Sequence, residues 1–194
     1  IVEATQIIDK RLQDRLTIQL ARQQNPIKYF LQPTITAKEH RGRKPENADM
    51  PFVRFPKWHF CSNCKLMKEF ALTRRNLPKC EESINGKQCR GQFSPLRFLI
   101  VCPDGHISDF PWQNWVHKGE PCTKSSRPNL FFKTNSRPGL EGVLIVCESC
   151  TLKRPMTGSM GDSQALRDVL PDGHCPGEKP WLLEEDADNC LQVP

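Results

Sequence analysis

Ten cysteines in 194 residues constrain the fold of this chain more than any other feature, and eight of them lie within residues 61–150. Disulfides are the alternative to metal binding, but Cys-x2-Cys pairs in a chain without secretory features are more often metal ligands. Seventeen prolines against eleven glycines indicate a loop-rich fold, in which bound metal replaces part of the missing apolar burial. We therefore expect zinc to be required for folding.

The first four cysteines form the clearest site in the sequence. Cys61-Ser-Asn-Cys64 has the Cys-x2-Cys spacing with which two thiolates bind one tetrahedral ion. Between Cys80 and Cys89 lies Asn85-Gly86, the dipeptide favoured in two-residue hairpin turns. Folding the chain back at this turn places both thiols on one face of a two-stranded ladder. We predict that Cys61, Cys64, Cys80 and Cys89 form one structural, four-thiolate zinc site of ribbon type.

A second Cys-x2-Cys pair, Cys147 and Cys150, needs two further ligands. Cys175 and Cys190 are the remaining candidates, with His174 as a substitute for either. The segments between them contain no turn signal comparable to Asn-Gly, so the grouping depends on ligand number alone. It predicts a second structural zinc site.

A third group mixes thiols with imidazoles. Cys102, His106, His117 and Cys122 could together bind zinc, since this borderline-soft ion accepts both ligand types. In the alternative interpretation the histidines only form hydrogen bonds in a turn and at a helix end, and the cysteines are buried as small apolar groups. The sequence thus predicts two or three zinc ions per chain.

Apolar periodicity together with the cysteine groups predicts an α+β fold of small zinc-stapled, zinc-ribbon-like modules with short strands and helices. Helical patterns occur over residues 1–24, 108–117 and 164–170, and strand patterns over 52–60, 95–102, 130–132 and 140–146, with 95–102 expected as a central strand. We expect an N-terminal helix and basic linker (1–51), a first zinc-ribbon-like module (52–101) and a second cysteine- and histidine-rich module (102–194).

A net charge of +6 favours an anionic partner. The cations that we expect to meet nucleic-acid phosphates are Arg41, Arg43, Lys44, Lys57, Arg74 and Arg75. For residues 32–51 a solvated loop is an equally good interpretation. Aromatic residues interleaved with cations in 52–60 suit base stacking, although packing around the first zinc site is the simpler explanation.

Several functional signatures are absent from the sequence. It contains no phosphate-binding Gly-x4-Gly-Lys-Ser/Thr or Gly-x-Gly-x2-Gly loop, no Gly-x-Ser-x-Gly elbow and no zinc-deaminase pairing. A metal-dependent hydrolase would need an open zinc site, which only the Cys102 to Cys122 group could supply, with Asp104 or Asp109 as base. Residues 1–4 open no signal peptide and no window could span a bilayer, so we expect a cytoplasmic protein.

Several phrases resemble one family. The run Arg54–Cys61, the phrase Cys102–Trp112 with Trp115-Val-His117 after it, the pair Pro180-Trp181 and the segment Ile8–Gln13 are similar to DrmB, the helicase-partner protein of DISARM antiphage systems. The resemblance implies a defence protein that works beside a superfamily-two helicase on DNA. Compared with that family, an opening segment and a long region after Cys190 are missing, so we expect an internal piece of a larger protein.

Together, the residues and the resemblance favour a non-catalytic module that binds DNA and acts as a scaffold for a helicase on another chain. A protein-interaction module that docks the helicase without contacting DNA is the alternative, and a metal-dependent hydrolase is a third possibility. Affinity for an oligonucleotide that falls steeply with salt would distinguish the first from the second.

Overall fold

The computed structural model describes residues 6–20, 30–31, 53–161, 163–182 and 187–194. The chain divides into two compact units, residues 1–52 and 53–194. In the first unit, β1 (Gln6–Ile7) pairs antiparallel with β2 (Phe30–Leu31), and helix α1 (Lys10–Leu20) follows β1. The Asp9 side chain caps this helix by accepting the Leu12 backbone N–H at 2.9 Å. The predicted N-terminal helix is therefore present, with no buried residue along it.

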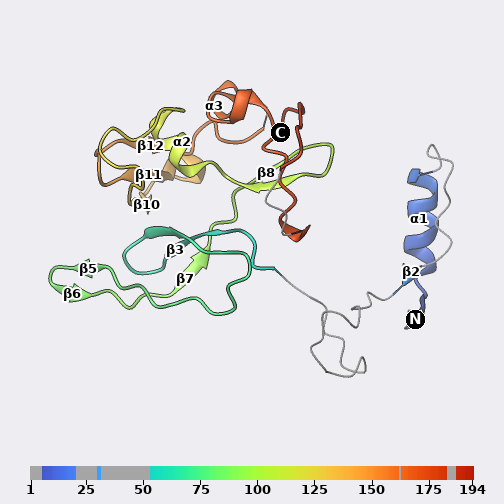
Figure 1. Cartoon of the computed structure of the whole chain (residues 1–194), viewed down its shortest axis with the longest axis horizontal. Helices are drawn as coiled ribbons and strands as arrows, with labels where there is room; N and C mark the ends of the chain where they lie inside the picture. The colour runs from blue at the N-terminus through green and yellow to red at the C-terminus, as the bar shows by residue number, and fades with distance from the viewer. Residues whose placement is uncertain (1–5, 21–29, 32–52, 162, 183–186) are drawn as a thin grey trace. The chain divides into compact units, whose positions relative to one another are not determined.

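The second unit is built on one six-stranded sheet (Figure 1). Its order is β12 (Lys153–Pro155), β11 (Val143–Cys147), β10 (Leu130–Thr134), β4 (Leu66–Glu69), β3 (Trp58–Cys61) and β7 (Phe93–Pro95). Every neighbouring pair is antiparallel. Leu130 pairs with Met67, so strands from both sides of residue 101 share this sheet.

Two small hairpins and several short helices complete the unit. The hairpins are β5 (Ser83–Ile84) with β6 (Lys87–Gln88), and β8 (Leu99–Val101) with β9 (Ile107–Asp109). The helices are α2 (Trp112–His117), α3 (Gln164–Arg167) and three 3-10 turns at Gly139–Gly142, Pro171–Gly173 and Pro180–Leu182. Among the described residues, no helix combines the length and apolar character that a membrane span requires.

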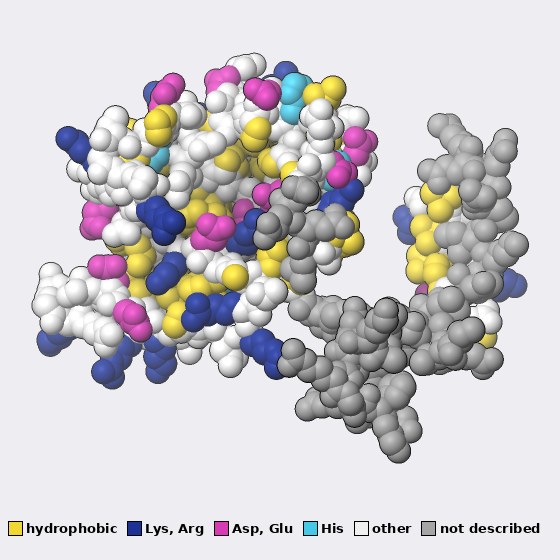
Figure 2. All heavy atoms as spheres, in the orientation of Figure 1, with side chains coloured by type: hydrophobic (Ala, Val, Ile, Leu, Met, Phe, Trp, Pro, Cys, Tyr) yellow, Lys and Arg dark blue, Asp and Glu magenta, His cyan; other side chains and the backbone are white. Residues whose placement is uncertain are grey.

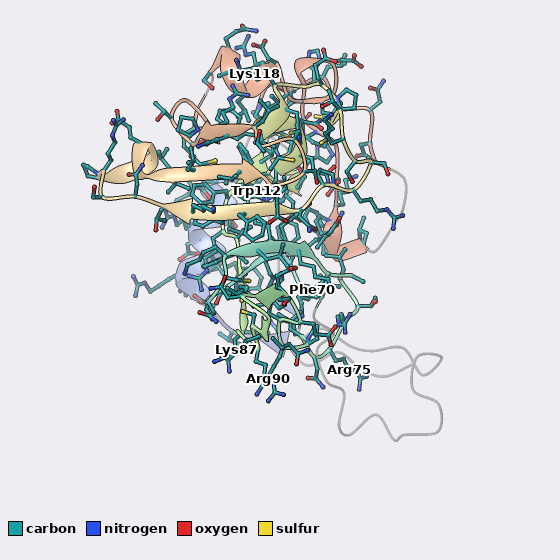
Figure 3. All side chains as sticks on the ribbon, turned by 90° about the vertical axis from the view of Figure 1, so that its left-hand side faces the viewer. Phe70, Arg75, Lys87, Arg90, Trp112 and Lys118 are labelled. Carbon is teal, nitrogen blue, oxygen red and sulfur yellow. The ribbon has the colours of Figure 1, made fainter. Side chains whose placement is uncertain are left out.

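Aromatic side chains around α2 form the core of this unit. Trp112 and Trp115 are almost completely buried, and Phe110 packs on both rings with centroid distances of 4.8 and 5.4 Å. They belong to the same buried cluster as Leu130 and Ile145 of the central strands. Trp112 lies in the middle of the unit in Figure 3. This packing holds α2 against β11 and β12.

The fold is mixed, with one main sheet and few helices, as the periodicity predicts, but two elements differ from expectation. The predicted central strand over 95–102 is wrong: the ladder breaks between β7 and β8, and β8 pairs with β9 outside the main sheet. Leu99 and Val101 are accordingly 37% and 53% exposed. The helix expected from residue 108 begins at Trp112, because residues 107–109 pair in β9.

Candidate metal centres

Three clusters of four metal-ligating side chains occur in the described part of the chain. In each cluster the four candidate ligand atoms lie within 4.8 Å of one another. Their members are Cys61, Cys64, Cys80 and Cys89 (first cluster); Cys102, His106, Cys175 and Cys190 (second cluster); and His117, Cys122, Cys147 and Cys150 (third cluster). All ten cysteines are free thiols, so none of the clusters is a pair of disulfides.

Distances within the clusters fit a tetrahedral ion. Ligands bound to tetrahedral zinc lie about 3.8 Å apart for two sulfurs and about 3.6 Å for sulfur and nitrogen. The Cys61–Cys89 and Cys64–Cys80 sulfur pairs are both 3.6 Å apart. The Cys102–Cys190 sulfur pair of the second cluster is 3.9 Å apart. A disulfide would bring two sulfurs to about 2 Å, which none of these distances approaches.

The first cluster is assembled by two tight turns. Cys61 ends β3, and the chain turns through the knuckle so that the Lys65 N–H donates to the Cys61 carbonyl at 3.0 Å. The β5–β6 hairpin turns at Asn85-Gly86 as predicted, with φ of 50° and 76°. The chain then passes close to the knuckle at Gly91, where a Cβ would overlap the Cys61 sulfur. A side chain at this position would displace a ligand.

The second cluster joins the β8–β9 turn to the C-terminal segment. His106 directs Nδ1 toward the Cys102 sulfur, 3.3 Å away, and its Nε2 lies 3.0 Å from an Asp188 carboxylate oxygen. Such a carboxylate fixes the tautomer and ring orientation of a ligating imidazole. The Cys175 N–H also donates to the Gln192 carbonyl at 2.9 Å, so the cluster holds the C-terminal segment in place.

The third cluster joins the end of α2 to the end of β11. His117 uses the opposite ring nitrogen: Nε2 is 3.4 Å from the Cys150 sulfur, and Nδ1 lies 2.7 Å from the Gln113 carbonyl. The Cys122 and Cys147 sulfurs are 3.9 Å apart. Here a backbone carbonyl within the helix takes the orienting role that a carboxylate has in the second cluster.

The structure brings together the first predicted site and regroups the other two. The predicted groups Cys102/His106/His117/Cys122 and Cys147/Cys150/Cys175/Cys190 are wrong as groups, although the same eight residues form the second and third clusters. The reason is the position of α2. Its packing against β11 carries His117 to the knuckle at the end of that strand, whereas His106 stays with the β8–β9 turn. His174 joins no cluster among the described residues.

One thiol in each cluster is unusually acidic. Burial raises the pKa of Cys89, but hydrogen bonds from the Gly91 amide and neighbouring groups outweigh it and lower the pKa to about 7. Cys102 follows the same pattern, with hydrogen bonds from His106 lowering its pKa to about 7. A backbone hydrogen bond from Lys124 lowers the pKa of Cys122 to about 7. Near neutral pH each cluster thus has one cysteine with a substantial fraction of thiolate, which is the form that binds metal.

The predicted nucleic-acid contacts separate into three groups. Arg41, Arg43 and Lys44 lie outside the described residues. The Lys57 ammonium lies 3.5 Å from a Glu178 carboxylate oxygen, so its charge is already partly compensated. The remaining two, Arg74 and Arg75, are exposed in the segment that follows β4.

Two further cations belong with this last pair. Lys87 and Arg90, which sequence reasoning missed, are exposed on the hairpin of the first cluster. Figure 3 shows Arg75, Lys87 and Arg90 extending from the same end of the unit, and in Figure 2 Lys and Arg side chains gather along its lower edge. We call Arg74, Arg75, Lys87 and Arg90 the basic end. The predicted hairpin could have identified Lys87 and Arg90 as exposed cations, since they lie on either side of Cys89, the last ligand of the first cluster.

The segment that carries Arg74 and Arg75 is held by backbone contacts. The Arg54 guanidinium donates to the carbonyls of Arg74 and Arg75 at 2.9 and 2.6 Å. Arg74 itself donates to the Asn76 carbonyl at 3.0 Å and stacks over the Phe70 ring at 5.5 Å. Arg75, Lys87 and Arg90 form no salt bridge within the described ranges, so their charges face solvent.

Comparison with known proteins identifies relatives of the chain. The family model described as "Domain of unknown function (DUF8724)" matches residues 2–194. The "DISARM protein DrmB" of Bacillus paralicheniformis is 30% identical over 154 residues, which is 75% of this chain and 25% of that protein. The chain therefore spans about a quarter of the length of this curated relative, and the resemblance to DrmB indicated by the motifs is confirmed. By its match over residues 2–194, the chain belongs to the DUF8724 family.

Proposed function

We propose that this chain is a zinc-stapled, non-catalytic module of a DISARM-type antiphage defence protein and that its basic end contacts nucleic-acid phosphates. The similarity to DrmB supports the defence role. The observation that carries the rest is the position of three cations of the basic end, Arg75, Lys87 and Arg90, which form no salt bridge among the described residues and extend from a hairpin and turn next to a four-thiol cluster. The proposed location is the bacterial cytoplasm, where phage DNA is attacked.

Zinc is the ion that best suits the three donor sets. One cluster offers four thiols, and the other two offer three thiols and one imidazole, the ligand sets of structural zinc sites. Bound zinc would act as a cross-link between segments and as the charge that keeps the thiols deprotonated. Each cluster supplies four protein ligands, which leaves no coordination position for a reacting water, and this supports a non-catalytic role.

The basic end would hold DNA without reading its sequence. Lysine and arginine side chains neutralise phosphates and release counterions, which is a sequence-independent interaction. Short, rigid attachment to the first cluster would keep the three cations at fixed spacing while a motor on another chain moves the nucleic acid. We propose a superfamily-two helicase as that partner, in keeping with the DrmB resemblance.

The test is anisotropy of a labelled duplex oligonucleotide with the zinc-loaded chain over a series of salt concentrations. If Arg75, Lys87 and Arg90 each neutralise one phosphate, replacing all three with Gln should make the slope of log K against log salt less steep by about 2.7. The matched control replaces three exposed cations elsewhere, Arg97, Lys118 and Arg137, with Gln. Lys118 lies at the opposite end of the unit (Figure 3), and both variants lose the same net charge.

We expect the control to retain the wild-type slope. Equal losses in the two variants would show that only the overall charge matters and would refute the assignment to the basic end. No binding of the wild-type chain even at low salt would refute nucleic-acid contact altogether. The chain would then fit the alternative of a module that docks the helicase without touching DNA.

A further inference from the structure

A groove of about 750 Å³ separates the β5–β6 hairpin from one face of the main sheet. Its floor includes a cross-strand row in which Phe131 of β10 pairs with Val146 of β11, and Val146 pairs with Lys153 of β12. Lys133 lies two residues beyond Phe131 on the same face of β10, and its ammonium is 5.7 Å from the Phe131 ring centre. Figure 1 shows the hairpin and these three strands on the same side of the unit.

One wall of the groove is a strand edge. In a hairpin with a two-residue turn, Ile84 and Lys87 exchange hydrogen bonds, and the next pair, Ser83 and Gln88, does not. The bond from the Cys89 N–H to the Glu82 carbonyl, at 2.8 Å, confirms this alternation. The backbone N–H and C=O of Ser83 therefore point outward from β5 into the groove, whereas those of Gln88 point outward on the other side. No described backbone group pairs with Ser83 on that edge.

The charges of the groove are balanced. Lys133 and Lys153 are offset by Glu82 and Glu148, which also line it. A continuous polyanion would meet both carboxylates, so the lining does not suit a nucleic-acid strand. An extended peptide suits it better, because a peptide can present an apolar side chain to the floor, a carboxylate to the lysines and its own backbone to the edge of β5.

We propose that this groove binds an extended peptide segment of a partner protein, which adds a strand to the free edge of β5. One apolar side chain of the peptide packs on Phe131 and Val146, and one acidic side chain faces Lys133 and Lys153. The first and third clusters hold the walls of the groove, since Cys64 and Cys147 both line it. This site is separate from the proposed nucleic-acid contact and does not depend on it.

The probe is a displayed library of ten-residue peptides, selected on the zinc-loaded full chain. Enriched peptides should alternate apolar and polar residues, include an acidic residue and bind the chain in solution. Ser83→Pro removes the amide donor on the groove side, and it should weaken these peptides at least about tenfold. The matched control is Gln88→Pro, which removes the equivalent exposed amide on the opposite edge and should leave the affinity unchanged.

A second variant keeps the test independent of the hairpin. This double variant, Lys133→Glu with Lys153→Glu, changes two residues of the sheet and none of the hairpin. It should lower the affinity of the acidic peptides and select basic peptides instead. Zinc content and near-ultraviolet circular dichroism should match the wild type for each variant interpreted. The proposal is overturned if no peptide is enriched or if both proline variants bind the peptides equally. It is also overturned if a single-stranded oligonucleotide displaces the peptide from the wild type but does not bind the Lys133→Glu/Lys153→Glu variant, because the groove would then be a nucleic-acid site.

Discussion

Pairs of cysteine substitutions can distinguish the clusters of the structure from the groups that ligand counting predicts. Cys150 and Cys175 belong to different clusters in the structure, whereas Cys175 and Cys190 belong to the same one. Replacing Cys150 and Cys175 together with Ala should therefore remove two ions. Replacing Cys175 and Cys190 together should remove only one, although both variants lose two thiols.

The expected size of the effect follows from four ligands sharing one ion. Structural zinc binds peptides with about 10–16 kcal/mol at pH 7. Divided equally over four ligands, the loss of one costs about 2.5–4 kcal/mol, which weakens zinc binding by a factor on the order of 10²–10³. A chelator of intermediate affinity will then remove zinc from a damaged cluster and leave the intact clusters loaded.

The assay is elemental analysis after dialysis against such a chelator. We expect three zinc equivalents in the wild type and two in each single variant, Cys150→Ala or Cys175→Ala. The Cys175/Cys190 variant should also retain two, and the Cys150/Cys175 variant should retain one. Hydrogen exchange adds a second readout: amides of residues 187–194 should exchange faster after Cys175→Ala, because loss of that ligand releases the ion that holds Cys190 in the second cluster, and not after Cys150→Ala. Two equivalents in the Cys150/Cys175 variant would refute the grouping in the structure.

Three further predictions concern the surroundings of the clusters. Asp109 accepts two backbone amides at the start of β3 at 3.0 and 3.1 Å, so Asp109→Asn, which turns an NH2 toward one of them, should cost about 1.5–3 kcal/mol in urea unfolding at pH 7. Because burial raises the Asp109 pKa, the folded state holds that proton more tightly, and the wild type should lose stability relative to the variant as the pH rises from about 4 through the folded pKa. Arg154 stacks 3.7 Å from an indole centre and donates to two carbonyls, so Arg154→Ala should lower the unfolding free energy by about 2–3 kcal/mol, and Arg154→Lys should restore less than half. Gly91→Ala should cost one zinc equivalent by displacing the Cys61 sulfur. Gly86→Ala adds a Cβ that meets nothing but is strained by the left-handed backbone, so it should lower stability and keep all three equivalents.

The first cluster could be predicted because its geometry is local. Its sulfur contacts join residues 16 and 28 positions apart, and a single recognisable turn brings the last two ligands, Cys80 and Cys89, together. The hairpin at Asn85-Gly86 has the left-handed backbone that this dipeptide favours, and the pairing of its strands then places Cys80 and Cys89. Nothing beyond the neighbouring strands is needed to choose these ligands.

The partners in the other clusters are chosen by tertiary packing. Cys102 and Cys190 meet across 88 residues, and His117 and Cys150 across 33. Which imidazole joins which thiols depends on where α2 packs, and that depends on burial of Trp112 and Trp115 against the sheet rather than on ligand spacing. Residue types therefore identified these candidate ligands, but spacing along the sequence could not group them.

The sequence also could not show which cations are available to a partner. Composition marked Lys57 as a phosphate contact, yet the fold brings a carboxylate from Glu178 to it across 121 residues. Lys87 and Arg90 are not part of a basic run in the sequence, so composition did not predict them as phosphate contacts. Only the folded hairpin places them at the same end of the unit as Arg75. A charge is available to a partner only if the fold leaves it without a closer counterion.

The three clusters lie at different connections of the chain, so metal bound at each would stabilise a different one. The first closes the hairpin that carries the basic end, the second attaches the C-terminal segment to the β8–β9 turn, and the third fixes α2 to β11. Only one of these connections, that between α2 and β11, is also supported by the aromatic core. The other two depend on their ligands together with backbone hydrogen bonds, such as those from Arg90 to Cys80 and from Cys175 to Gln192. Metal occupancy there should therefore affect local order, and with it the cations and the strand edge that a partner would contact.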